Sequence, residues 1–360
     1  MGTISIRKVS LIATPLAGRV NLAVKTDDLL YIKDENGIEY PIGAGELGGT
    51  HYLFVKGDGT DTENAQELQA AYDEAKLLLP FSPITQADAI TILVAPGLYN
   101  FGSTTFELDT EYINVVALNS TNPIRLYGPV GNARVTFNST DPNGTIFINS
   151  DNVYVYGVDV DSKNFRVGDN LSSIKIESCS GGDFSFGGVL FGDPPLDISG
   201  TFINCQGGDL SFAGNGEANG RFIGCQGGQE SFGYDFASGE FIDCIGGDFS
   251  FAYGGIMTGT FENCKGGVGS FGSIGGIGGS VTRNCQADDG SFGFNAIIFD
   301  STFEYCTGGE DSFGKTFLTT NEGKFYNCRL SVGTFDTPTV GGFIVLGIDG
   351  NNTVQNITGF

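Results

Sequence analysis

Acidic residues that recur at a fixed distance after the cysteines are the side chains of this chain best suited to chemistry. An Asp or Glu stands four residues after five of the eight cysteines, at Asp183, Asp209, Asp248, Asp289 and Glu310. If equivalent positions stack, two carboxyl groups approach the separation of about 5–5.5 Å that retaining glycosidases use. A solvent-facing loop carrying part of the negative charge is the plainer interpretation. We therefore assign no catalytic residue and keep Asp209 and Asp248 as weak candidates for polysaccharide cleavage.

The eight cysteines are the second candidate for chemistry. Stacked on adjacent strands about 4.8 Å apart, their Cα atoms would lie within the range that a disulfide spans. Synthesis in the cytosol favours reduced thiols, and the chain has no Cys-x-x-Cys pair of the kind that clamps zinc. Because free cysteine is among the most buried residue types, we expect a buried column of thiols with no metal and no cofactor. Disulfides and a bound metal are the alternatives.

His51 is the only histidine of the chain. A catalytic arrangement around a second histidine is therefore excluded. We place His51 in a linker before the first strand, where a surface role is expected. Asp58 and Asp61 carry the ligand type that calcium prefers, but a turn and a helix N-terminus explain them without a metal.

A repeat of about twenty residues positions these side chains. The cysteines are Cys179, Cys205, Cys225, Cys244, Cys264, Cys285, Cys306 and Cys328, with successive spacings of 26, 20, 19, 20, 21, 21 and 22 residues. A phenylalanine follows each cysteine by seven residues, and a serine precedes seven of those eight phenylalanines. Another phenylalanine stands three residues before most cysteines. Self-similarity at this period indicates a solenoid.

The residue before each cysteine explains how the chain turns. It is Asn, Asp or Gly in six of the eight repeats, with Ser178 and Tyr305 as the exceptions. These residue types tolerate the left-handed region, so a corner there lets Phe and Cys both point inward despite their odd spacing. The Gly pairs that follow, such as Gly207-Gly208, predict a second bend. Each repeat is then one coil, with Phe stacked on Phe and Cys on Cys.

Residues 52–99 predict a strand, a helix and a second strand. Residues 52–62 form a strand and a Gly-Asp-Gly turn, and residues 92–99 form a strand that runs into a Pro-Gly turn. Between them lies a helix that should end at Pro80, with Thr60 and Glu63 as a capping box. Its apolar residues at helical spacing are Ala65, Leu68, Ala71, Tyr72, Ala75 and Leu79. Short strands follow, among them Ile124 to Tyr127.

This stretch resembles the start of the pectate-lyase-like right-handed parallel β-helix of bacteriophage tailspikes and fibres. The matching segments are Gly57-Asp58-Gly59-Thr60-Asp61, the Ala- and Gln-containing helix from Gln66 to Ala75, and Ala95-Pro96-Gly97-Leu98-Tyr99. The resemblance covers roughly residues 50–165. It implies an all-β, right-handed parallel β-helix whose one short N-terminal helix covers the open end, where strand edges would otherwise be exposed.

The chain is expected to have five segments. Residues 1–43 are similar to hairpin segments of phage fibre and virion proteins that help attach the fibre, and they contain an Asn-Gly turn at Asn36-Gly37. Residues 44–50 are a linker, residues 51–170 the capped start of the β-helix, and residues 171–340 the Cys/Phe repeat. Residues 341–360 are expected to close the last coil.

Composition limits the partners. With 18 Lys and Arg against 42 Asp and Glu, the net charge is −24, which repels phosphate backbones and makes nucleic acid an unlikely partner class. The apolar runs are too short to span a bilayer, so no membrane is expected, and residues 1–10 do not have the pattern of a secretory signal. An apolar content of 40% excludes a disordered acidic chain.

The function predicted from these features is that of a structural virion protein, made in the host cytoplasm. It is a tailspike- or fibre-like appendage that docks on other virion proteins through residues 1–43 and contacts host surface polysaccharide. The resemblance implies a homotrimer. Two alternatives remain: a polysaccharide depolymerase on the same β-helix, and a bacterial surface scaffold without a virus.

Overall fold

The computed structural model describes ten segments and six further strands. The segments are residues 51–79, 85, 88–118, 134–141, 144–160, 165–168, 171–187, 197–214, 216–313 and 323–330; the strands are 8–9, 21–25, 30–33, 39–42, 343–348 and 354–357. The chain divides into two compact units, residues 1–163 with 174–180 and residues 164–173 with 181–360. The two units are described separately.

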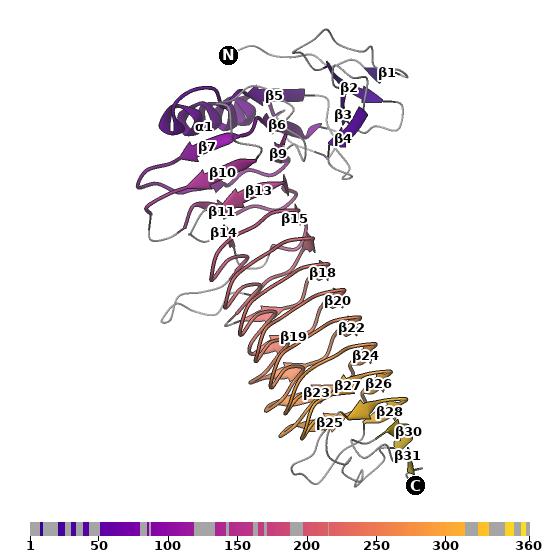
Figure 1. Cartoon of the computed structure of the whole chain (residues 1–360). Coiled ribbons are helices and arrows are strands. Elements are labelled where there is room, and N and C mark those ends of the chain that lie inside the picture. The colour runs from indigo at the N-terminus through magenta and orange to yellow at the C-terminus, as the bar shows by residue number, and fades with distance from the viewer. Residues whose placement is uncertain are drawn as a thin grey trace. The chain divides into compact units, whose positions relative to one another are not determined.

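Each unit contains stacked coils of short parallel strands (Figure 1). A single helix is present in the described residues. The prediction of an all-β right-handed parallel β-helix with one N-terminal helix is confirmed.

The N-terminal segment forms a small sheet of its own. Its strands are β1 (Lys8–Val9), β2 (Asn21–Lys25), β3 (Leu30–Lys33) and β4 (Glu39–Ile42). β3 pairs antiparallel with both β2 and β4, which is the pairing of two hairpins, and β1 pairs parallel with β2. The predicted Asn36-Gly37 turn and the linker at 44–50 lie outside the described residues.

The first unit has a parallel sheet of β5 (His51–Val55), β6 (Ile90–Val94), β9 (Ile113–Ala117), β12 (Tyr154–Tyr156) and β15 (Lys175–Glu177). A second sheet joins β7 (Gly97–Asn100), β10 (Val135–Asn138) and β13 (Val158–Val160), and β8 (Phe106–Leu108) pairs with β11 (Ile146–Ile148). The placement of His51 in a linker was wrong, because His51 begins β5 and pairs with Ile90. The predicted strand from Ile124 to Tyr127 lies outside the described residues.

Helix α1 (Asp61–Leu78) covers the first coil. It begins with the predicted capping box of Thr60 and Glu63, and the predicted apolar face is buried except for Leu79, which is the C-cap. The helix packs against β5, β6 and β7, and Tyr72 meets the Phe106 ring edge-on at 5.6 Å. These contacts bury the apolar face of the helix over the interior of the first coil. Pro80 lies outside the described residues.

The two motifs that flank the helix pack on each other. Gly57 has a φ of +64°, and a Cβ there would lie 2.6 Å from the hydroxyl oxygen of Tyr99. That hydroxyl donates to the carbonyl of Ala95 at 2.7 Å, and the Asn64 amide donates to the carbonyl of Leu98 at 3.0 Å. The glycine is therefore required by both its backbone conformation and the close approach.

The second unit has one long parallel sheet and one shorter sheet. The long sheet contains β16 (Thr201–Ile203), β18 (Arg221–Ile223), β20 (Glu240–Ile242), β22 (Thr260–Glu262), β24 (Val281–Arg283), β26 (Thr302–Glu304), β28 (Lys324–Tyr326) and β30 (Phe343–Ile348), with β27 (Thr307–Gly308) and β29 (Arg329–Leu330) beside them. The five-stranded sheet contains β17 (Glu217–Ala218), β19 (Phe236–Ala237), β21 (Ile256–Met257), β23 (Gly276–Gly278) and β25 (Ile297–Phe299). β14 (Phe165–Val167) precedes the regular coils, and β31 (Val354–Ile357) pairs antiparallel with β30.

Two columns of phenylalanine fill the interior of the second unit. Phe212, Phe232 and Phe251 stack at centroid distances of 4.7 and 4.9 Å with their rings nearly parallel. A second column, which includes Phe241 and Phe261, stacks at 4.8 Å. The columns meet edge to face, as between Phe241 and Phe251 at 5.7 Å and 90°, an arrangement that aromatic rings favour. The predicted stacking is confirmed; Phe335 lies outside the described residues.

The predicted corner is confirmed in every repeat. All eight residues before the cysteines have a φ between 52° and 62°, including the exceptions Ser178 and Tyr305. The reversal of side-chain direction at this residue turns the following cysteine inward, and all eight cysteines are buried and form no disulfide.

The second bend begins directly after the predicted Gly pair and not at it. Its residues with a positive φ include the seven phenylalanines, from Phe186 to Phe313, that follow a cysteine by seven residues. The glycines are needed for close approach instead: a Cβ on Gly207 would meet the Ser211 side chain at 2.3 Å, and one on Gly208 would meet Asp183 Oδ1 at 2.1 Å.

Buried serines support this turn. The Ser250 hydroxyl accepts from the Ser231 amide at 3.4 Å and donates to the Gly228 carbonyl at 3.3 Å, both in the preceding coil. The Phe251 amide donates to the Ser231 carbonyl at 3.1 Å. These contacts satisfy the buried polar groups of a conformation that a phenylalanine rarely adopts.

Candidate functional site

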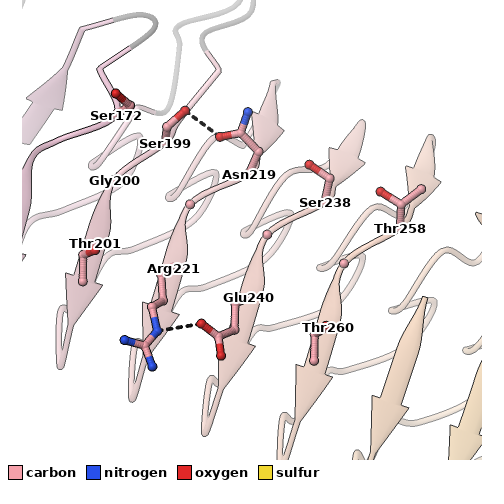
Figure 2. A pocket seen from close by; sticks show the side chains of 13 residues that line it. Ser172, Ser199, Gly200, Thr201, Asn219, Arg221, Ser238, Glu240, Thr258 and Thr260 are labelled. Atoms are coloured by element: carbon pink, nitrogen blue, oxygen red, sulfur yellow. Dashed lines mark hydrogen bonds and ion pairs between the residues drawn. The ribbon is translucent and has the colours of Figure 1, made fainter. Parts of the chain in front are cut away.

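A shallow groove of about 800 Å³ runs along the second unit where the five-stranded sheet meets the long sheet. In one coil β17 ends at Ala218, Asn219 and Gly220 form the corner, and β18 begins at Arg221. The same arrangement recurs in the neighbouring coils, so the groove crosses successive coils (Figure 2).

Two rows of side chains border this groove (Figure 2). One row lies at the corners and consists of Ser199, Asn219, Ser238 and Thr258; the other begins the strands and consists of Thr201, Arg221, Glu240 and Thr260. Each coil therefore presents one hydroxyl or amide from the corner and one polar side chain from the strand.

Glycines form the floor between the rows. A Cβ on Gly220 would lie 2.5 Å from the carbonyl oxygen of Gly200, and one on Gly239 would lie 2.1 Å from the carbonyl oxygen of Gly220. Gly259 meets Gly239 in the same way. Successive coils come this close only because these positions lack a side chain.

The charges in the groove compensate each other. Arg221 Nε lies 2.6 Å from a carboxylate oxygen of Glu240, and these two are the only charged residues among those that line the groove. The Ser199 hydroxyl donates to Asn219 Oδ1 at 2.6 Å, and Ser238 bonds Glu217. The lining is therefore neutral and rich in donors and acceptors, within a chain of net charge −24.

The weak catalytic candidates do not line the groove. Asp209 and Asp248 are exposed, and the coil between them carries Gln229 at the equivalent position. Asp209 Oδ1 accepts from the Gln229 amide at 2.8 Å, and Asp248 Oδ1 accepts from the Val268 amide at 2.8 Å. Asp183 and Asp289 make the same contact with the next coil. The recurring acid thus joins successive coils; its catalytic role stays a prediction.

The thiols are buried among apolar side chains. Cys225 Sγ lies 3.4 Å from the carbonyl oxygen of Phe202 in the preceding coil, and Cys244 Sγ lies 3.3 Å from that of Phe222. Burial raises the pKa of both thiols, and it raises the pKa of Cys179 in the first unit to about 12. Protonated thiols of this kind are poor nucleophiles and poor ligands.

Two further kinds of site are missing from the described part of the chain. No group of three or more His, Cys, Asp or Glu residues there is placed to hold a metal ion. Nor do those residues include a helix long and apolar enough to cross a membrane.

The groove escaped the sequence analysis although a signal was present. The two residues before β16, β18, β20 and β22 read Ser-Gly, Asn-Gly, Ser-Gly and Thr-Gly at 199–200, 219–220, 238–239 and 258–259. Alignment of the repeats on their cysteines would have placed these polar residues in one row beside a row of glycines.

Comparison with known proteins gives little further information. No family model matches the chain, and no curated protein matches it. A solved structure described as Geobacillus virus E2 ORF18 is matched with 12% sequence identity and a TM-score of 0.32, over 90% of this chain and 66% of that one. This chain therefore spans slightly less than two thirds of that protein's length.

Proposed function

We propose that the protein is a structural component of a virion, a tailspike- or fibre-like appendage whose solenoid holds a surface glycan in its lateral groove. The observation that carries this proposal is the pair of polar rows on a floor of glycine, repeated once per coil. Such a site suits an extended polymer with a short repeat better than a compact ligand.

The chemistry of the lining favours a neutral glycan. Serine, threonine and asparagine side chains both donate and accept hydrogen bonds, as sugar hydroxyls do. Coils recur at about 4.8 Å, close to the rise of one sugar unit in an extended chain, so successive units can meet equivalent groups. The net charge of −24 disfavours an anionic polymer.

The appendage part of the proposal is supported by the beginning of the chain. Residues 57–61 and 95–99, on which the resemblance to phage β-helix proteins depends, pack against each other as the ends of one closed first coil. The separate small sheet of β1 to β4 suits a docking segment for other virion proteins. A homotrimer and a place on the virion belong to the same proposal.

A printed array of bacterial surface polysaccharides tests the binding role. The full chain is expected to bind neutral polymers, with binding little changed by salt because few charges are involved. The double variant Asn219→Ala, Ser238→Ala should weaken binding at least tenfold, because two hydrogen-bonding groups are lost. Gln226→Ala, an exposed residue outside the groove, is the matched control. Equal binding by the groove variant and the control would refute the assignment.

Cleavage of a glycan is the second candidate, because Asp183 and Asp209 occupy equivalent positions in successive coils. Asp209→Asn and Asp248→Asn each keep the oxygen that accepts the amide but lose the charge. If the acids are structural, both variants melt like the wild type and any depolymerising activity on capsular polysaccharide is unchanged. Loss of activity with unchanged melting would favour the enzyme.

A further inference from the structure

The outer face of the five-stranded sheet carries an apolar column. Phe236, Ile256 and Ile297 occupy equivalent outward positions on β19, β21 and β25, and Gly276 on β23 stands between the two isoleucines. Phe299 lies beside them, with its ring over Gly278. The four large residues are each between 41% and 45% exposed.

The fold does not require this column. The residues that alternate with it, among them Ala237, Met257 and Ile298, are the ones that point into the core, and they are fully buried. In the same coils, three of the four outward positions that begin strands of the long sheet are polar, Glu240, Thr260 and Thr302, and the fourth is Val281. Contiguous exposed apolar side chains of this kind mark an interaction surface.

We propose that this face, centred on Phe236, Ile256, Ile297 and Phe299, is the surface through which copies of this chain associate. The column presents large side chains at intervals of one or two coils along a straight line. A partner must offer side chains at the same spacing along the same direction, and a second copy of this solenoid does so by construction. Gly276 itself is buried between the two isoleucines, so the apolar surface of the column is formed by the larger side chains on either side of it.

The charge of the chain also favours a second copy as the partner on this face. Copies with a net charge of −24 repel one another, so they can approach only through faces that lack charge. Across the five strands of this sheet the one charged residue is Glu217, at the β17 end. The strand residues of β19, β21, β23 and β25 are uncharged, and Asp235 and Asp300 lie at the margins of the apolar column. A small apolar centre ringed by polar groups is the usual form of an interface hot spot.

This inference specifies the surface of the homotrimer expected above, and it is independent of the groove and of any glycan. Analytical ultracentrifugation of the full chain over a range of concentrations tests it. The wild type should form a defined oligomer, and the triple variant Phe236→Ser, Ile256→Ser, Ile297→Ser should raise the dissociation constant at least tenfold. An unchanged far-UV circular dichroism spectrum and melting at low concentration show that the variant is folded.

The matched control is Ile245→Ser, Val268→Ser, which alters two residues of similar exposure, 42% and 41%, outside this sheet. It should associate like the wild type. A wild type that stays monomeric at its highest soluble concentration, or a triple variant that associates as the wild type does, overturns the inference. Glycan binding by the triple variant is expected to persist, so failure of this proposal and failure of the groove proposal are distinguishable.

Discussion

The two units build parallel coils in different ways. In the first unit the residues paired along the main sheet are unevenly spaced: Ile90 pairs with Ile113, Val115 with Val155 and Val155 with Ile176. In the second unit Phe202, Phe222, Phe241 and Phe261 follow one another at 20, 19 and 20 residues. The interior of the main sheet is aliphatic in the first unit and formed by columns of one residue type in the second.

The difference shows what equal coil length permits. When the coils are of equal length, equivalent residues of successive coils stack directly on one another. The same set of residues, a left-handed corner, a phenylalanine, a cysteine and a serine, can then be repeated through the whole stack. Where coil lengths vary, each coil needs its own packing, and the first coil is covered by a helix. The groove and the apolar column both depend on this repetition, and both lie in the second unit.

The largest loss of stability is expected when a stacked phenylalanine in the second unit is replaced. Phe251→Asp places an unpaired charge in the fully buried interior and should prevent soluble folding, and Phe251→Ala should cost about 3–5 kcal/mol. Soluble yield and urea unfolding measure this. Ile245→Asp, at an exposed position, is the control and should fold. Normal melting of Phe251→Asp would mean that this column faces solvent.

The second largest effect is expected at high pH, where the buried thiols should lower the free energy of unfolding. Burial raises the pKa of Cys225, Cys244 and Cys264 above their ordinary value of 9. Unfolding then releases protons above pH 9, so the free energy of unfolding is unaffected below that pH and falls as pH rises, by about 1.4 kcal/mol per pH unit for each thiol. Urea unfolding at increasing pH tests this, and Cys244→Ala should reduce the slope by one such step. An unchanged slope in that variant contradicts a buried thiol.

Replacing a glycine where two coils approach closely should cause a smaller loss of stability. In Gly228→Ala the added Cβ would lie 2.1 Å from Asp209 Oδ1 and 2.9 Å from the Asp209 amide nitrogen, so the coils must move and the free energy of unfolding should fall by about 1–3 kcal/mol. Gly102 in the first unit has a φ of +64° with nothing within 4 Å. Gly102→Asn should therefore cost under about 0.5 kcal/mol, because Asn tolerates this conformation. Equal losses at the two sites would contradict the tight spacing.

The smallest expected effect is a gain. Tyr305 occupies a left-handed corner with a φ of 57° and is 61% exposed. Tyr305→Asn supplies the residue used at most other corners and should raise the free energy of unfolding by about 1 kcal/mol. Asn263→Tyr in another coil should lower it by a similar amount. Thermal melting of the pair checks this, and the prediction fails if both changes act in the same direction.

The repeated sequence pattern made the β-helix predictable. Features whose geometry does not follow from a repeated residue type were harder to predict. Corner residues and the two phenylalanine columns recur in nearly every coil, so their geometry follows from residue type alone. The bend at Phe251 was placed wrongly, because a bulky residue disfavours positive φ and only the Ser231 and Ser250 contacts with neighbouring coils compensate for it.

The candidate site was less accessible to sequence reasoning. The amide bound by Asp248 belongs to the next coil, and this contact depends on the exact height of one coil above another. The two polar rows of the groove carry five different residue types between them, so no single residue type recurs there in every coil. In the five-stranded sheet, strands of two or three residues are too short for alternation to identify Phe236 or Ile256 as outward-facing.

Sulfur anomalous diffraction from crystals of the full chain tests the central claim most directly. The account predicts that the seven sulfur atoms from Cys205 to Cys328 form one line through the second unit, separated by about the 4.8 Å between hydrogen-bonded strands. Sulfur sites scattered through the map would contradict the stacking of equivalent side chains, and with it the groove and the apolar column.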